Sequence, residues 1–209
     1  MKKTIITLTS LLFFMYAVNA QKASIGFTAG ASLANYEAKE DGTNGTDKSK
    51  PGFTAGFITN IPTGKNFMIQ TGAHWVQKGT IEKDDNGSGG TDKISLTVNS
   101  IEIPVNFLFN SKGFFIGAGP SASFAVSGKL KANDVSVKAK FGNSDDDVMK
   151  GFDFGANILS GYQSAGGFLI MANFNQGFSN LVPGGSNNGT LKSHYFGIRI
   201  GYVLKGKKS

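Results

Sequence analysis

Eight stretches of the chain alternate polar and apolar residues, and the gaps between them are in turn long and short. A strand with this alternation has one apolar face and one mixed face. Eight such strands, with tight turns at one end and long loops at the other, predict an all-β fold. The predicted fold is an eight-stranded antiparallel up-and-down transmembrane β-barrel with short periplasmic turns and long extracellular loops. The expected strands lie near residues 24–36, 51–61, 67–81, 94–109, 114–129, 150–163, 168–181 and 193–204.

The short gaps have the composition of tight turns. They are Pro62–Asn66, Asn110–Gly113 and Ser164–Gly167, each rich in glycine, asparagine or serine. Two prolines interrupt this simple pattern, because Pro104 and Pro120 fall inside expected strands. A proline removes one ladder hydrogen bond, and a closed barrel has no free edge for it. We therefore expect a β-bulge at each proline.

The first twenty residues have the features of a secretory signal peptide. Lys2 and Lys3 supply a positive start, a short apolar run follows, and Val18-Asn19-Ala20 ends it with small residues at the cleavage positions. We therefore expect a signal peptide at 1–20 and one outer-membrane barrel domain at 21–209. The apolar run is shorter than the roughly 20 residues of a membrane helix.

Composition narrows the classes of function. The formal net charge is +7, which becomes +5 without Lys2 and Lys3, and Arg199 is the only arginine. Nucleic-acid-binding proteins usually gather their basic residues on one element. Here the lysines are scattered over loops and the tail, so no nucleic-acid partner is expected. The chain has no cysteine, which removes disulfides, thiol chemistry and thiolate metal sites.

Aromatic residues gather near the ends of the expected strands, where the barrel would meet the two membrane interfaces. Most of the predicted girdle flanks the short turns, whereas Trp75 lies toward the long loops. All of its members share the outward parity of their strands. They are Phe67, Trp75, Phe109, Phe114, Tyr162, Phe168 and Tyr202.

Charged residues inside the strands follow the opposite parity. Glu102 and Asp153 are the acidic residues well inside strands, and Arg199 has the same inward parity. We interpret these three residues as a structural ion network in the lumen that fills the barrel and fixes strand order. The alternative is a gate in a narrow lumen. An eight-stranded barrel encloses a space just wide enough for side chains, which favours the structural interpretation.

No catalytic, cofactor or metal site is expected. His74 and His194 are the only histidines, and neither accompanies a nucleophile elbow or a triad spacing. We interpret His74 as a polar lumen residue and His194 as a rim residue. The segment from Asp84 begins like a calcium loop, but its twelfth position is Ser95, where a bidentate glutamate is needed.

Several segments together resemble a known family. Lys50-Pro51-Gly52-Phe53, Ile101-Glu102-Ile103-Pro104-Val105, Gly117-Ala118-Gly119-Pro120, Phe152-Asp153-Phe154-Gly155, Asn175–Asn180 and Gly197–Tyr202 follow one another at its spacing. The chain is similar to the small outer-membrane β-barrel domain family of Gram-negative bacteria, often called porin-like or PorT-like. The resemblance spans the expected mature chain. It implies an eight-stranded barrel in the cell outer membrane, and it implies little about activity.

The function expected from these observations is that of a non-enzymatic integral outer-membrane barrel, with a structural role in the envelope or an interaction role of its loops, including in secretion. Its partners would be outer-membrane lipids (lipopolysaccharide and phospholipid) and an unknown protein bound through the extracellular loops, with no cofactor. Three alternatives stay open: a narrow passive pore, a lipid-modifying enzyme, and a soluble exported barrel that binds a ligand.

Overall fold

The computed structural model describes residues 23–40, 43–44, 48–85, 91–132, 135–144, 146–185 and 189–204. The predicted signal peptide lies outside the described residues. Nearly all of the described chain is strand, and its short 3-10 helix is η1 (Pro183–Gly185). No helix in the described ranges has the length and apolar character needed to cross a membrane.

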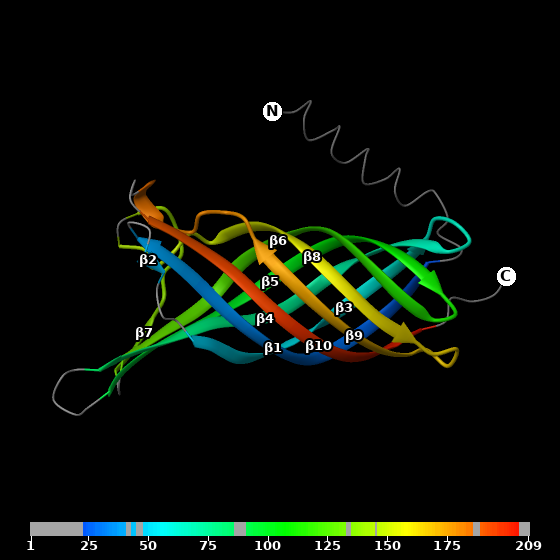
Figure 1. Ribbon diagram of the computed structural model, residues 1–209, viewed down its shortest axis with the longest axis horizontal. Helices are drawn as coiled ribbons and strands as arrows, with labels where there is room; N and C mark the ends of the chain where they lie inside the picture. Colours follow the sequence, from blue (N-terminus) through cyan, green and yellow to red (C-terminus); the bar gives the residue numbers. More distant parts are fainter. Residues whose placement is uncertain are drawn as a thin grey trace.

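Eight antiparallel strands close into a barrel (Figure 1). Each strand pairs with the next along the chain, and β10 pairs with β1 to close the ring. The strands are β1 (Ser24–Glu40), β3 (Lys48–Pro62), β4 (Phe67–Asp85), β5 (Thr91–Ser111), β6 (Phe114–Ala132), β8 (Phe152–Gln163), β9 (Phe168–Gly177) and β10 (Gly189–Val203). The predicted all-β, eight-stranded up-and-down topology is thus confirmed.

The tight turns all lie at one end of the barrel, and the long connections lie at the other (Figure 1). At the long-loop end, β4 and β5 continue well beyond the neighbouring strands, because their backbone pairing runs to Asp85 and Thr91. Two further strands sit there: β2 (Thr43–Asn44) pairs with β1, and β7 (Val135–Lys138) pairs with β6. The expected loop at 130–149 therefore contains a short hairpin.

The expectation of a β-bulge at each proline is wrong. The pairing of β5 with β6 keeps one register from Pro104 to the short turn, and Pro120 keeps its place opposite Ala156 on β8. At each proline the backbone ladder omits hydrogen bonds, but no extra residue is inserted. The carbonyl of Pro104 accepts a hydrogen bond from Oγ1 of Thr71 (2.8 Å). The register shifts lie instead beside Asn99 and near Pro51, between Ser49 and Thr54.

Away from the register shifts, side chains alternate between the two faces of the barrel wall. On β8 and β9, apolar residues at every second position are exposed, and their neighbours are buried in the lumen. The exposed set includes Phe107, Ile116, Ile158, Phe174 and Ile198. A wall with an apolar exterior suits a hydrocarbon surrounding.

The lumen is packed in layers. An apolar cluster fills the end near the short turns, formed by Ile58, Leu108, Phe115, Leu159, Leu169, Met171 and Val203. A second apolar cluster lies toward the long loops, formed by Tyr36, Leu96, Val98, Ala139, Met149 and Leu181. Buried polar and charged side chains occupy further lumen positions, and they form the candidate site.

Candidate functional site

A buried charged centre lies inside the barrel, where β4, β5 and β10 face one another. Oε1 of Glu102 accepts a hydrogen bond from the hydroxyl of Tyr195 (2.6 Å). Its other oxygen, Oε2, lies 3.7 Å from Nζ of Lys78. The side chain of Glu102 is completely buried, and that of Lys78 is 2% exposed. A carboxylate and an ammonium this deeply buried are stable only when they are paired and hydrogen-bonded.

Lys78 also links this centre to β6 and β8. Its Nζ donates to Oγ of Ser123 (3.3 Å), which is the cross-strand partner of both Glu102 and Asp153. Asp153 in turn accepts a short hydrogen bond from Oγ of Ser193 on β10 (2.6 Å). The ammonium therefore lies in the part of the lumen that carries the two acidic residues predicted from the sequence.

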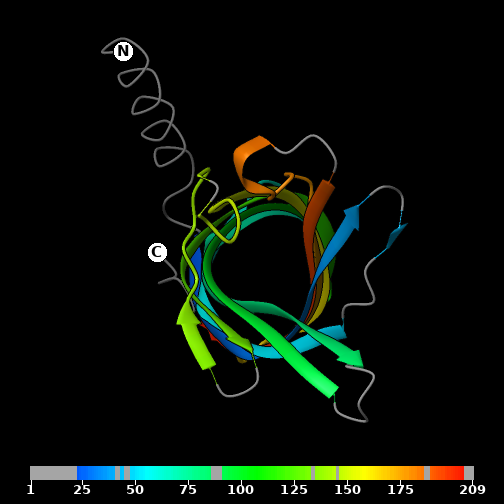
Figure 2. The same ribbon diagram turned by 90° about the vertical axis from the view of Figure 1, so that its left-hand side faces the viewer.

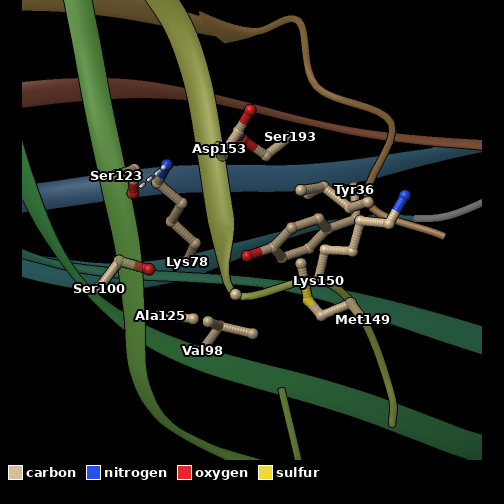
Figure 3. Close-up of a pocket in the computed structure, with 12 residues that line it drawn as sticks. Tyr36, Lys78, Val98, Ser100, Ser123, Ala125, Met149, Lys150, Asp153 and Ser193 are labelled. Atoms are coloured by element: carbon tan, nitrogen blue, oxygen red, sulfur yellow. Dashed lines mark hydrogen bonds between the residues drawn. The ribbon is translucent and has the colours of Figure 1, made fainter. Parts of the chain in front are cut away.

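A small cavity lies beside Lys78, toward the long loops (Figure 3). Lys78, Ser123, Asp153 and Ser193 contribute its polar wall, and the ring of Tyr36 points its hydroxyl into the same space. The cavity measures about 10 Å³, which is room for about one water molecule. A space of this size holds no substrate or ligand.

Arg199 lies close enough to the buried charged centre to interact electrostatically with Tyr195 and His74. Its guanidinium donates a hydrogen bond to Oδ1 of Asn173 (2.9 Å). The side-chain amide of Asn173 donates to that of Asn157 (3.1 Å), which in turn donates to that of Asn106 (3.1 Å). Gly119 lies on β6, the strand between Asn157 and Asn106, and is the cross-strand partner of Asn157. A methyl group there would overlap the carbonyl oxygen of Val105 and crowd the Cα atom of Asn106, so the absence of a side chain allows β5 and β6 to approach closely here. This amide chain joins β10, β9, β8 and β5.

The structure thus places Glu102, Asp153 and Arg199 in the lumen, all buried. Among the described residues, no ion pair within 4 Å joins Arg199 to either acid, and the cation beside Glu102 is Lys78. A single network of the three predicted residues therefore stays a prediction. The sequence analysis missed Lys78, although its odd spacing from Trp75 gives it inward parity. It also missed the inward-facing asparagines, which follow the same rule.

The two histidines lie on opposite faces of the wall. His74 is buried in the lumen as the cross-strand partner of Glu102. His194 has outward parity, and its ring centre lies 6.3 Å from that of Phe174. Ser193 and Asp153 form a serine–acid pair, but His194, next in sequence to Ser193, points away from it. A serine–histidine–acid relay is therefore not assembled from these residues.

Comparison with known proteins agrees with this geometry. The family model described as "Outer membrane protein beta-barrel domain" matches residues 19–182. The chain belongs to this outer-membrane β-barrel family. The finer PorT-like name stays a prediction. No curated protein matches the sequence.

One of the similar solved structures, neisserial surface protein A, supports the fold. It is similar with a TM-score of 0.51 and 11% identity, over 87% of this chain and 99% of that chain. Ail, the attachment invasion locus protein of Yersinia pestis, is matched with a TM-score of 0.46 and 14% identity, over 88% of this chain and 99% of that chain. At these identities the likeness concerns the fold. The family membership places this barrel in the outer membrane.

The predicted girdle residues of this outer-membrane barrel all lie on its exterior. Near the short turns, Phe67 packs on Phe109 (5.5 Å between ring centres) and Phe114 packs on Tyr162 (4.7 Å). Phe168 and Tyr202 are direct cross-strand partners at the same end. Their assignment to the membrane interface stays a prediction.

Toward the long loops, a second exterior row crosses four strands in register. It runs from Trp75 through Ile101 and Phe124 to Phe152. Just beyond it the exterior becomes polar. Side-chain hydrogen bonds of 3.1 Å join Gln77 to Asn99 and Asn99 to Ser127. The register shift beside Asn99 turns Ser127 outward, although simple alternation from Phe124 would place it in the lumen.

Two segments at the long-loop end pack against the rim of the barrel. Figure 2 shows this end from outside, with the segment after β7 and the segment containing η1 lying around the barrel mouth. Ala139 and Met149 are buried in the loop-side apolar cluster, and the amide of Lys150 donates to the carbonyl of Leu181 (2.8 Å). The two longest connections are therefore bound to each other and to the barrel.

Proposed function

We propose that this outer-membrane barrel is a closed, non-enzymatic anchor, whose long-loop end faces outward and binds a partner outside the cell. The observation that carries the proposal is the filled lumen. Apolar clusters lie toward both ends, with buried polar side chains packed in the same lumen. A barrel packed in this way offers a rigid wall to lipid and a stable base to its loops.

The packing argues against the narrow pore. A water path along the axis would have to cross the layer around Phe115 and Leu108 at one end and the layer around Met149 and Leu181 at the other. Layers of buried apolar side chains hold no continuous water. The Lys78–Glu102 pair is neutralised internally, so this pair presents no net charge to a passing ion.

The geometry also favours binding over lipid hydrolysis. The serine–acid pair, Ser193 and Asp153, is buried and lacks the histidine beside it. The cavity next to that pair holds about one water molecule and no acyl chain. The extended strands β4 and β5 and the β6–β7 hairpin, by contrast, project beyond the aromatic row that contains Trp75.

Conductance of single molecules in a planar bilayer tests the closed lumen. We expect no conductance steps from the purified, folded protein at moderate voltage. Regular steps of constant size would contradict the proposal. A variant in which Leu108, Phe115 and Leu159 are all alanine serves as a comparison, because it opens only one of the two apolar layers and is expected to stay closed.

Cysteine labelling tests the orientation. Since the native chain has no cysteine, Ser136→Cys on β7 and Lys65→Cys on a short turn each create one thiol, and both sites are exposed. A membrane-impermeant maleimide should label Ser136→Cys on intact cells and Lys65→Cys only after lysis. The reverse result would contradict the outward orientation. A photo-crosslinker on the same thiol at position 136 then captures the partner.

A further inference from the structure

The β6–β7 hairpin at the long-loop end has two chemically different faces. Lys129 lies directly opposite Lys138, and Lys131 lies opposite Ser136. These side chains share one face, and all are exposed, as is Lys140 two residues beyond Lys138. The opposite face carries Leu130, Ala132, Val135 and Val137. Three lysines thus project from one side of a two-stranded ribbon, and Lys140 follows just beyond its end.

The lysine face is the exterior face of the barrel wall. Leu130 packs against the loop-side apolar cluster, and a side chain at Gly128 would meet Ala139 and Phe141. Residues 128 and 130 therefore point inward. Because strand residues alternate, Lys129 and Lys131 point outward, toward the surrounding lipid.

The lysines also lie at a defined depth. The exterior rows run in order from Ile101 with Phe124, through Asn99 with Ser127, to Thr97 with Lys129. Four residues separate Ile101 from Thr97, which is about 13 Å along a strand and about 10 Å along the axis of a barrel whose strands tilt by roughly 40°. Aromatic girdles mark the edge of the hydrocarbon, and the headgroup layer beyond is about 5–8 Å thick. Lysine stems reach back over such a distance.

Among the described residues, the lysine face has no carboxylate paired with it. In the described part of the chain, no carboxylate lies within 4 Å of Lys129, Lys131, Lys138 or Lys140. Like charges directly opposite each other on neighbouring strands are destabilising, so a nearby anion would stabilise the Lys129–Lys138 pair. The anions at this depth of an outer membrane are the phosphates of its lipids.

We propose that Lys129, Lys131, Lys138 and Lys140 form a binding site for the phosphate groups of a phosphorylated glycolipid in the outer leaflet. The inference rests on the proposed outward orientation and names one partner of the long-loop end. Two neighbouring ammonium groups suit a headgroup with more than one phosphate. The lipid would hold the hairpin against the membrane surface and leave its apolar face toward the barrel mouth.

Binding of bisphosphorylated lipid A to the detergent-folded full chain, followed by native mass spectrometry, tests the site. An anionic lipid surface contributes roughly a factor of five in affinity per nearby lysine. K129Q/K138Q is therefore expected to bind roughly 25-fold more weakly, and the wild type should bind monophosphorylated lipid A less tightly. K65Q/K112Q removes the same charge from exposed turns at the other end and should bind like the wild type.

The proposal is overturned if K129Q/K138Q, shown to be folded by its heat-modifiable mobility, keeps wild-type affinity. It is also overturned if inorganic phosphate or a soluble sulfated sugar displaces the lipid at equal concentration, because the site would then recognise any anion. The binding assay uses purified protein and is independent of orientation in cells. A failure of the proposed orientation appears instead in the cysteine labelling.

Discussion

Nζ of Lys78 lies 3.7 Å from Oε2 of Glu102 and 5.3 Å from the centre of the Tyr195 ring. Tyr195 thus serves both charges at once, because its ring faces the ammonium and its hydroxyl donates to the carboxylate. The three residues come from β4, β5 and β10, so the contact fixes the relative position of strands on opposite sides of the lumen. A register slip of β4 or β5 would leave a buried charge unpaired, and a slip of β10 would remove the Tyr195 hydroxyl from the carboxylate.

Lys78→Met should destabilise the barrel strongly, because it leaves the Glu102 carboxylate buried without its cation. Removing one partner of a buried ion pair costs about 3–5 kcal/mol. The double variant K78M/E102Q removes both charges and keeps an acceptor for Tyr195, so it should recover most of that loss. The free energy of unfolding in guanidinium, measured in lipid vesicles, checks both values. A double variant no more stable than Lys78→Met would contradict the pairing.

Gly177→Ala should also destabilise the barrel. A Cβ atom at Gly177 would overlap Oδ2 of Asp153 and lie 2.8 Å from Oγ of Ser193, so the Asp153–Ser193 hydrogen bond would have to move. Overpacking of this kind costs about 1–3 kcal/mol. Gly166→Ala is the matched control, because its nearest atom would lie 3.6 Å away, at Oγ of Ser164. Equal stability of the two variants would show that the crowding at position 177 is relieved without loss.

A lysine on the exterior should be tolerated according to its depth. Ile198 lies between the two aromatic rows on β10, whereas Tyr202 lies at the short-turn end of the same strand. A basic residue facing the middle of the hydrocarbon costs about 2–4 kcal/mol, falling to about 0–1 near the interface. Ile198→Lys should therefore be clearly less stable than Tyr202→Lys in guanidinium titrations from vesicles. The opposite order would place the membrane elsewhere on the barrel.

The sequence was sufficient to predict the eight strands, because their alternation determines which face meets lipid. Phe107, Ile116, Phe174 and Ile198 all lie outside, and Arg199 lies inside, as their parity predicts. Strand ends were predicted less well. The pairing of β4 and β5 continues through the polar residues that follow Lys78 and precede Leu96, since backbone hydrogen bonds require no apolar alternation.

Long-range partners were beyond the sequence pattern. Parity shows that Glu102 and Lys78 both face inward, but only the register of β4 against β5 and the curvature of the wall bring them together. Pro104 and Pro120 show the same limit in another form. A missing donor can be absorbed by skipping a ladder bond, and the sequence does not show whether a bulge replaces it.

The orientation of the apolar faces can be measured directly on the single tryptophan of the chain. Trp75 is exposed on the exterior aromatic row of β4. In proteoliposomes made with phospholipids brominated on their acyl chains, its fluorescence should be strongly quenched, and acrylamide in the water should quench it weakly. Strong quenching by acrylamide with no effect of the brominated lipids would contradict the account, because Trp75 would then face water.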